Sequence, residues 1–335
     1  MSTPDASFRI AAVQATPVFL DRDATLDKAC ALIAEAGRHD ARLIVFPESF
    51  IPAYPDWVWA VPAGEASLHN ALYARLLANA VEIPGPATAR LCQAASQAGA
   101  YIVMGLTERN TEASGGSLYN TMLLIDPQGQ ILGRHRKLVP TGGERLVWAP
   151  GDGSTLAVYD TALGRIGGLI CWENYMPLAR YALYAWGAQL YIAPTWDQGE
   201  PWLATLRHIA REGRVFVVGC CMALRRDDIP DHFEFKSYYQ GAGEWINAGD
   251  SAIVHPNGKY LAGPLHEHED ILYAEITLEH WRGAKRMLDV AGHYARPDVF
   301  QLTVNRMPRP LIRAREEAWA ADDAAEQEVI GRQQW

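Results

Sequence analysis

Residues 167–174 read Gly167-Gly168-Leu169-Ile170-Cys171-Trp172-Glu173-Asn174, and they place a cysteine directly after a short apolar run. The run 166–170 is typical of a buried strand, and Pro177 begins an apolar segment of helical character. Parallel α/β folds carry their chemistry at the carboxyl ends of strands. Cys171 is therefore the first candidate nucleophile, and the rest of the chain is searched for groups that could activate it.

Strands and helices alternate on both sides of this stretch, which predicts an α/β fold. Two antiparallel hairpins interrupt the alternation, at 118–125 with 130–135 and at 251–254 with 260–262. The other predicted strands are 8–14, 43–46, 101–106, 155–159, 166–170, 190–193, 215–219 and 271–276, and the predicted helices are 23–37, 66–79, 86–98, 177–186 and 201–211.

The chain shows no internal repeat and no low-complexity linker. We therefore expect one catalytic domain over residues 1–305, followed by a charged, Ala/Glu-rich extension over residues 306–335.

The composition is that of a globular protein with a substantial core, because 49% of the 335 residues are hydrophobic and 21% are charged. A net charge of -9 without a basic cluster argues against nucleic-acid binding. Neither a signal peptide nor a membrane span can be drawn in the sequence, so we expect a cytoplasmic protein without a membrane partner. Five widely spaced cysteines fit reduced thiols better than a disulfide framework.

Two further reactive side chains share the context of Cys171, because each follows a predicted strand. Glu48 comes after the apolar run 43–46 and Pro47, and Lys137 follows the second strand of the first hairpin. A carboxylate can accept the proton of a thiol, and an ammonium group favours the thiolate. Each residue alone would more often be structural: a packed cysteine, a loop carboxylate and a solvated lysine. Their coincidence at three strand ends favours a catalytic set.

Three segments around these residues resemble the signature segments of the nitrilase superfamily, and the resemblance extends to about residue 300. The segments are Phe46-Pro47-Glu48, His135-Arg136-Lys137-Leu138-Val139-Pro140-Thr141 and Cys171-Trp172-Glu173-Asn174. The form Cys-Trp-Glu-Asn, together with Glu144-Arg145-Leu146-Val147-Trp148 and Gly151-Asp152-Gly153, looks like nitrilases of the bacterial and plant type.

The resemblance implies an α-β-β-α sandwich that dimerises into an αββααββα unit, and it implies assembly into homo-oligomers such as spirals or filaments. It also implies roles for individual residues. Glu48 would be the general base, Cys171 the nucleophile and Lys137 the stabilising cation, while Glu144 matches a glutamate that many members place beside the lysine.

The implied reaction is hydrolysis of a small-molecule nitrile to a carboxylic acid and ammonia through a thioimidate and a thioester, without a metal or an organic cofactor. The backbone N–H of Trp172 is the natural candidate for an oxyanion donor. An amidase using the same residues is the alternative enzyme, and a non-catalytic scaffold of the same fold is the alternative outside catalysis.

Aromatic residues flank the candidate site, although packing is the usual role of such side chains. They predict a pocket that favours aromatic or arylaliphatic nitriles. The candidate substrate-binding residues are Tyr54, Trp57, Trp59, Trp172, Glu173, Thr195 and Trp196. For self-association, we expect contacts through residues 175–185 and through the C-terminal region.

Overall fold

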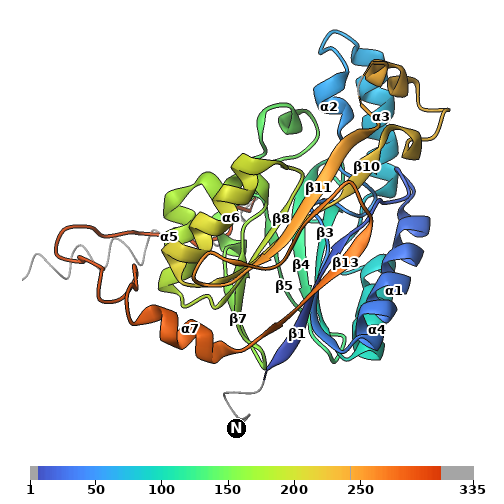
Figure 1. Cartoon of the computed structure of the whole chain (residues 1–335). Helices are drawn as coiled ribbons and strands as arrows, with labels where there is room; N and C mark the ends of the chain where they lie inside the picture. Colours follow the sequence, from blue (N-terminus) through green and yellow to red (C-terminus); the bar gives the residue numbers. More distant parts are fainter. Residues whose placement is uncertain (1–6, 242, 311–335) are drawn as a thin grey trace, which may run out of the picture.

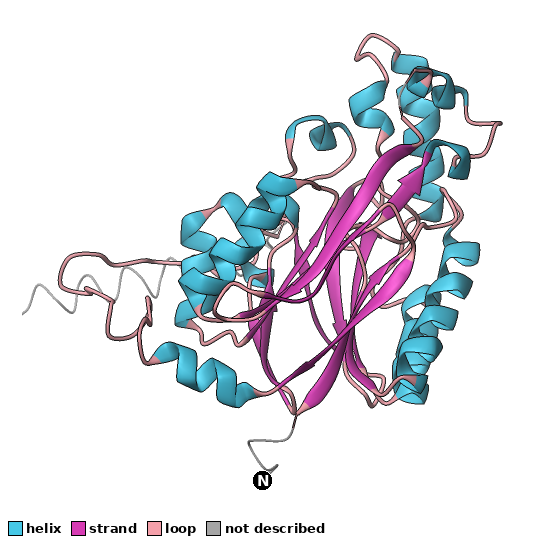
Figure 2. Cartoon of the chain, in the orientation of Figure 1, coloured by secondary structure: helices cyan, strands magenta, loops and turns pink. Residues whose placement is uncertain are grey.

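The computed structural model describes residues 7–241 and 243–310, and its two β-sheets face each other between two layers of helices (Figures 1 and 2). The predicted α-β-β-α sandwich is therefore confirmed. Figure 1 shows α1 and α4 on one side of the sandwich, and α5 and α6 on the opposite side.

The first sheet has six strands in the order β13-β1-β2-β3-β4-β5. β1 and β2 are parallel, as are β2 and β3, whereas β4 and β5 form the predicted antiparallel hairpin. The strands are β1 (Phe8–Gln14), β2 (Ala41–Val45), β3 (Tyr101–Arg109), β4 (Leu118–Ile125), β5 (Ile131–Arg136) and β13 (Asp270–Ile276).

The second sheet has seven strands, with β10-β11-β9-β8-β7-β6 in sequence across it and β12 paired to β11. β7, β8 and β9 run parallel to one another. The strands are β6 (Val158–Thr161), β7 (Gly164–Gly168), β8 (Leu190–Thr195), β9 (Phe216–Cys221), β10 (Ala223–Arg225), β11 (Trp245–Val254) and β12 (Tyr260–His266).

Seven α-helices lie in the described residues, together with short 3-10 helices. The α-helices are α1 (Arg22–Arg38), α2 (Trp57–Ala60), α3 (Ala66–Asn79), α4 (Pro86–Ala98), α5 (Pro177–Ala185), α6 (Glu200–Gly213) and α7 (Leu278–Lys285). The 3-10 helices are Gly142–Leu146, Gly153–Thr155, Cys171–Tyr175, Arg226–Asp228 and Glu234–Tyr239. None of the helices in this part of the chain has both the length and the apolar character needed to cross a membrane.

The layers follow from the alternation of side chains along each strand. In β1, Ile10 and Ala12 pack between the two sheets, whereas Ala11 and Val13 pack under α1 and α4. In β8, Ile192 packs between the sheets and Tyr191 faces α5 and α6. Strands that are buried on both faces therefore read as continuous apolar runs in the sequence.

The structure differs from the sequence-based expectation in the position of some elements. β6 begins at Val158 rather than at 155, because Gly153–Thr155 forms a 3-10 turn. β7 ends at Gly168, two residues before the predicted end, and α7 was not predicted. The region 227–244, expected to be a polar loop, contributes Phe233 and Phe235 to a buried aromatic cluster.

The proposed division at residue 305 falls where the chain packs back onto the domain. Arg306 lies over the ring of Trp186 at 5.1 Å, and the Arg309 N–H donates to Asp152 Oδ2 at 2.9 Å. Residues 311–335 of the predicted extension lie outside the described residues.

Candidate active site

Cys171 is the first residue of the 3-10 helix that follows β7, and its backbone is in the left-handed region with a φ of 51°. A non-glycine residue in this region is strained by about 1–3 kcal/mol, and such strain concentrates at functional sites. β7 and β8 approach closely just before it, because a Cβ at Gly168 would lie 2.1 Å from the Ile192 carbonyl oxygen. Glycine at this position is therefore required for the approach that brings Cys171 to the strand end.

The turn that carries Cys171 is held by Asn174. Its Nδ2 donates to the carbonyl oxygens of Leu169 and Cys171 at 2.9 and 2.8 Å, and its Oδ1 accepts from the Tyr191 hydroxyl at 2.7 Å. Asn174 is fully buried. These bonds satisfy backbone groups inside the protein and fix the orientation of the thiol.

Glu48 is placed by a segment that bulges against β3 after the end of β2 and pairs with β3 again at Ile51. The Ile51 N–H donates to the Gly105 carbonyl oxygen at 3.3 Å, and a Cβ at Gly105 would lie 1.9 Å from the Pro47 carbonyl oxygen. Only glycine leaves room for this close approach. Within the bulge, Glu48 is fully buried.

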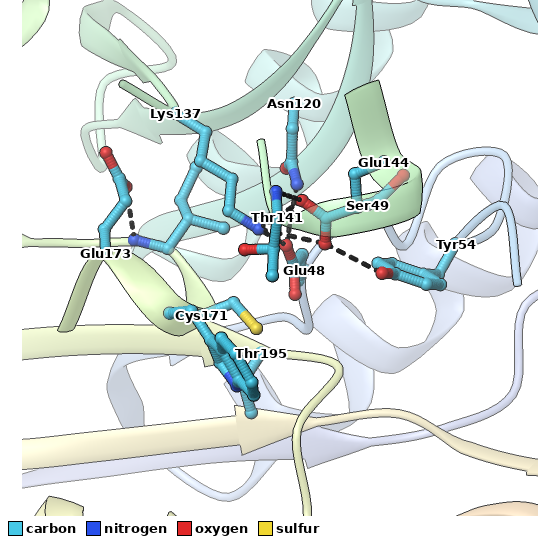
Figure 3. A network of polar contacts seen from close by, with 12 residues as sticks. Glu48, Ser49, Tyr54, Asn120, Lys137, Thr141, Glu144, Cys171, Glu173 and Thr195 are labelled. Atoms are coloured by element: carbon cyan, nitrogen blue, oxygen red, sulfur yellow. Dashed lines mark hydrogen bonds and ion pairs between the residues drawn. The ribbon is translucent and has the colours of Figure 1, made fainter. Parts of the chain in front are cut away.

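Lys137 follows β5 and lies between two carboxylates (Figure 3). Its Nζ donates to Glu48 Oε1 at 2.8 Å and to Glu144 Oε2 and Oε1 at 2.8 and 3.1 Å. All three side chains are buried. The structure thus brings Glu48, Lys137 and Glu144 together as the sequence predicts.

Neighbouring groups fix both carboxylates. Glu144 accepts from the Tyr54 hydroxyl and from the Thr141 N–H, each at 2.7 Å, and Asn120 Nδ2 donates to Glu48 Oε1 at 2.7 Å. Glu48 Oε2 has no hydrogen-bond partner among the described residues. In Figure 3 the Glu48 carboxylate lies close to the Cys171 sulfur.

Burial controls the protonation of these groups. It raises the pKa of the Cys171 thiol, the negative charge of Glu48 raises it further, and Lys137 and the Thr195 hydroxyl only partly oppose the shift. Burial also raises the pKa of Glu48, against the opposing charge of Lys137. Cys171 therefore rests as a thiol, beside a carboxylate with an increased affinity for protons.

Lys137 shows the opposite balance. Burial alone would lower its pKa, but the charges of the carboxylates Glu48 and Glu144 outweigh burial and raise it. Lys137 therefore remains an ammonium ion and can act as a cation and hydrogen-bond donor, but not as a base.

Glu173 connects the segments that carry Lys137 and Cys171. Its Oε1 accepts from the Leu138 N–H at 2.6 Å, its Oε2 accepts from the Ile170 N–H at 2.8 Å, and His135 Nε2 lies 3.0 Å from Oε2. Burial acts to raise the pKa of Glu173, but His135 and the two N–H groups lower it. Glu173 is therefore ionised, and its two hydrogen bonds hold the backbone of Leu138 close to that of Ile170.

A pocket of about 820 Å³ opens above Cys171, a size that suits a small organic ligand. Most predicted substrate-binding residues line it, namely Tyr54, Trp59, Trp172, Glu173 and Trp196. Trp196 stacks on Tyr54, with ring centroids 4.4 Å apart and planes at 4°. Trp172 is held at the edge by its indole N–H, which donates to Asp197 Oδ2 at 2.8 Å.

Two predicted substrate-binding residues are placed differently. Thr195 contacts the Cys171 thiol but is not among the residues lining the pocket. Trp57 is fully buried in the aromatic cluster, with ring centroids 6.2 Å from Phe19 and 5.8 Å from Phe235. Its position corrects the sequence-based assignment, because its indole supports the loop behind the pocket and does not face the pocket.

Several residues of the site were not singled out by the sequence. Asn120 lies within β4, and its bond to Glu48 spans 72 positions, so no local pattern points to it. Asp56 and Met176 also line the pocket. Asp56 falls inside the aromatic segment 51–63, where a single acidic residue among proline and aromatic residues is the signal that the sequence offers.

No group of three or more metal-ligating side chains within residues 7–241 and 243–310 is arranged to hold a metal ion. The cysteines are all free, and Cys171 is buried. The arrangement can carry out nucleophilic attack on an electrophilic carbon, with a base, a cation and a thiol in place.

Comparison with known proteins shows close similarity over most of the chain. A family model described as carbon-nitrogen hydrolase matches residues 9–286. Nitrilase 1 of Arabidopsis thaliana is 43% identical over 318 residues, covering 92% of this chain and 90% of that protein. The aliphatic nitrilase of Sinorhizobium fredii is 44% identical over 307 residues, covering 91% of this chain and 98% of that protein.

Solved structures of lower sequence similarity share the fold. A nitrilase-superfamily member from Saccharomyces cerevisiae has a TM-score of 0.67 at 22% identity, covering 88% of this chain and 98% of its own. An amidase from Nesterenkonia sp. has a TM-score of 0.60 at 22% identity, covering 84% of this chain and 94% of its own.

Proposed function

The chain belongs to the carbon-nitrogen hydrolase family, and on that premise we propose that it is a nitrilase, which hydrolyses an organic nitrile to the carboxylic acid and ammonia. The observation that carries the proposal is Lys137 held between two buried carboxylates beside a buried thiol. Relatives named nitrilases, 41–44% identical over at least nine-tenths of this chain, support the choice of nitriles within the family.

The reaction begins with transfer of a proton from Cys171 to Glu48, because a thiol whose pKa is raised needs a base. The sulfur then forms a bond to the nitrile carbon, and the nitrogen takes up a proton to give a thioimidate. Lys137 stabilises the negative charge that develops on nitrogen. The N–H of Trp172 lies in the first turn of its 3-10 helix, where N–H groups lack helical partners, and can donate to the same charge.

Two water molecules complete the reaction. The first adds to the thioimidate carbon, and the carbon–nitrogen bond breaks to release ammonia and leave a thioester. The second water hydrolyses the thioester to the carboxylic acid and restores the thiol. Glu48 can take and return the protons in each step, since its raised pKa is nearer to neutrality.

We propose that the pocket favours aromatic or arylaliphatic nitriles. Its walls include Tyr54, Trp59, Trp172 and Trp196, so a phenyl group can pack against aromatic side chains on several sides. Equal turnover of small aliphatic nitriles, with no gain for phenyl-bearing ones, would contradict this preference.

We further propose that the protein is cytoplasmic and forms homo-oligomers built from dimers. Five free cysteines are consistent with a reducing compartment. Exposed apolar side chains at Trp172, Tyr175 and Leu178 lie in or beside the segment 175–185, where contacts between copies are expected.

The decisive experiment compares the wild-type protein with Cys171→Ala on matched nitriles and amides. We expect ammonia release from phenyl-bearing nitriles to be abolished in the variant while its melting temperature stays near that of the wild type. Activity that persists in Cys171→Ala would refute the assignment. Release of ammonia from amides alone would favour an amidase, and no release from either class would favour a non-catalytic scaffold.

A further inference from the structure

Asp56 lines the substrate pocket although its side chain is almost completely buried, with 5% of the residue exposed. It lies immediately before α2, between Tyr54, which donates to Glu144 in the site, and Trp57, which is buried in the core. Its carboxylate is therefore almost fully enclosed, in a residue that forms part of the pocket wall.

The partners of Asp56 within the described residues are neutral. Its Oδ2 accepts a hydrogen bond from the Tyr239 hydroxyl, and the indole of Trp196 also donates to the carboxylate. No cationic side chain in this part of the chain forms an ion pair with Asp56 or affects its pKa. The carboxylate thus has hydrogen-bond donors but no opposite charge.

The other acidic side chains of the pocket are balanced or solvated. Glu144 is paired with Lys137, and Glu173 lies against His135. Asp197 is only partly buried and accepts from the Trp172 indole. Asp56 is the exception among these four carboxylates.

A buried carboxylate without a cation is costly, and such groups are concentrated at functional sites. Burial raises the pKa of Asp56 to about 6, while the bonds from Tyr239 and Trp196 pull it down. The group is still mainly ionised near neutral pH. It therefore presents a negative charge to whatever occupies the pocket.

A purely structural role for Asp56 would be to tie the region 226–244 to the pocket through Tyr239. That role needs only a hydrogen-bond acceptor, which a neutral side chain supplies without the cost of a buried charge. It also leaves unexplained why a charged residue stands in the pocket wall.

We propose that Asp56 is a specificity residue that selects nitriles carrying a cationic amino group; the inference rests on the proposed function. The apolar walls would hold the carbon skeleton while Asp56 pairs with the ammonium group. Nitriles carrying a carboxylate would be repelled.

The test uses nitriles of one skeleton that differ in a single substituent. Suitable probes are 4-(aminomethyl)benzonitrile, 4-(hydroxymethyl)benzonitrile and 4-(carboxymethyl)benzonitrile, together with the meta isomers to vary the distance to the nitrile. For the wild type, we expect kcat/KM to be highest with the ammonium compound. Asp56→Asn should lower the ratio of kcat/KM for the ammonium over the hydroxyl compound by about tenfold or more, because a desolvated charge pair is lost.

Tyr239→Phe is the matched control, since it removes a hydrogen bond to Asp56 but keeps the carboxyl group. Because that bond lowers the pKa of Asp56, this variant is assayed at alkaline pH, where Asp56 stays ionised without it. It should retain the preference for the ammonium compound. If Asp56→Asn fails to fold, Asp56→Ser is a second neutral variant with a hydrogen-bond acceptor. An ammonium-to-hydroxyl ratio that is unchanged in a folded Asp56→Asn or Asp56→Ser variant would overturn the proposal.

A binding measurement separates this proposal from the proposed reaction. Calorimetric titration of Cys171→Ala with benzylammonium and with benzyl alcohol needs no turnover. We expect tighter binding of the cation, lost when Asp56→Asn is added. If the wild type hydrolyses no nitrile, the nitrilase assignment fails while this titration still decides the role of Asp56; equal affinity for the cation and the alcohol would refute it.

Discussion

At the scale of single residues, Lys137 organises the site because it carries a buried charge between two buried carboxylates. Removing Lys137 would leave two carboxylates in the interior without a cation, which costs far more than an exposed ion pair contributes. The group has one positive and two negative members, so the negative charge of Glu144 lies close to Glu48. Glu144 accordingly raises the pKa of Glu48.

The pH dependence of turnover should report this coupling. Glu48 must be ionised to act as a base, and burial raises its pKa, so activity should be lost as the pH falls through a value above the ordinary 4.5. Glu144→Gln removes a neighbouring negative charge and should move the acid limb of kcat/KM to lower pH, whatever its effect on the maximal rate. A limb that stays in place or moves upward in this variant would contradict the coupling.

Glu173 acts at a distance from the reacting atoms, so we regard it as a positioning residue. Glu173→Gln puts an amide NH2 where one of the two backbone N–H groups now donates, and the segments of Leu138 and Ile170 should separate. We expect kcat to fall by about tenfold to a hundredfold with a small change in KM, since small displacements of reacting groups are costly.

The matched control for Glu173→Gln is Glu275→Gln, which alters an exposed carboxylate paired with Arg9. It should leave kcat unchanged. A Glu173→Gln variant in which KM rises and kcat is retained would mean that Glu173 binds the substrate rather than holding the site together.

The sequence predicts a site residue when the strand just before that residue sets its position. It does not predict one whose position or role depends on contacts with residues far away in the chain. Glu48, Lys137 and Cys171 each follow a strand that is visible as an apolar run, so their convergence was predictable. Asn120 and Asp56 were not, because their roles depend on partners 72 and 183 positions away. Trp57 was misassigned since sequence alone does not reveal which side of a loop faces the pocket.

At the scale of elements, the strand ends were predictable and the turns between them were less so. Continuous apolar runs identify β1, β2, β8 and β9 because both faces of these strands are buried. The start of β6 was misplaced since a 3-10 turn at 153–155 has no periodicity of its own. The segment 227–244 looks like a polar loop in the sequence, although its aromatic residues are buried. Their packing partners, such as Phe19, lie far away in the sequence, so no local pattern reveals the burial.

The close approach of the Glu48 segment to β3 at Gly105 gives a prediction at this scale. Gly105→Ala would place a methyl group against the Pro47 carbonyl oxygen, so the backbone must shift. We expect a loss of about 2 kcal/mol or more of unfolding free energy and a disproportionate loss of turnover, since Glu48 moves with Pro47. Urea unfolding and ammonia release measure the two effects.

Gly64→Ala is the control for that substitution, because nothing lies within 4 Å of a Cβ at Gly64. It should change neither stability nor turnover appreciably. A Gly105→Ala protein with unaltered stability would show that the contact between Gly105 and Pro47 tolerates a side chain.

At the scale of the whole molecule, the exposed apolar side chains near α5 predict self-association. Leu178 is 68% exposed and lies in α5. If this surface joins copies of the chain, Leu178→Asp should lower the molecular mass in sedimentation experiments, because burying a carboxylate at an interface is unfavourable. Met287→Asp, which alters an exposed apolar residue outside α5, should not do so. An unchanged assembly in Leu178→Asp would exclude α5 as a contact.

The reacting groups come from both layers of the sandwich. Glu48 and Lys137 follow strands of the first sheet, whereas Cys171 and Thr195 belong to the second. Cys171 therefore lies beside Glu48 and Lys137 only while the two sheets keep their relative position across the apolar layer between them. Gentle heating or mild denaturant can shift one sheet against the other while each sheet keeps its own hydrogen bonds. Under such conditions, turnover should be lost before the far-ultraviolet circular dichroism signal changes. The catalytic rate would then report how stable the packing between the two sheets is.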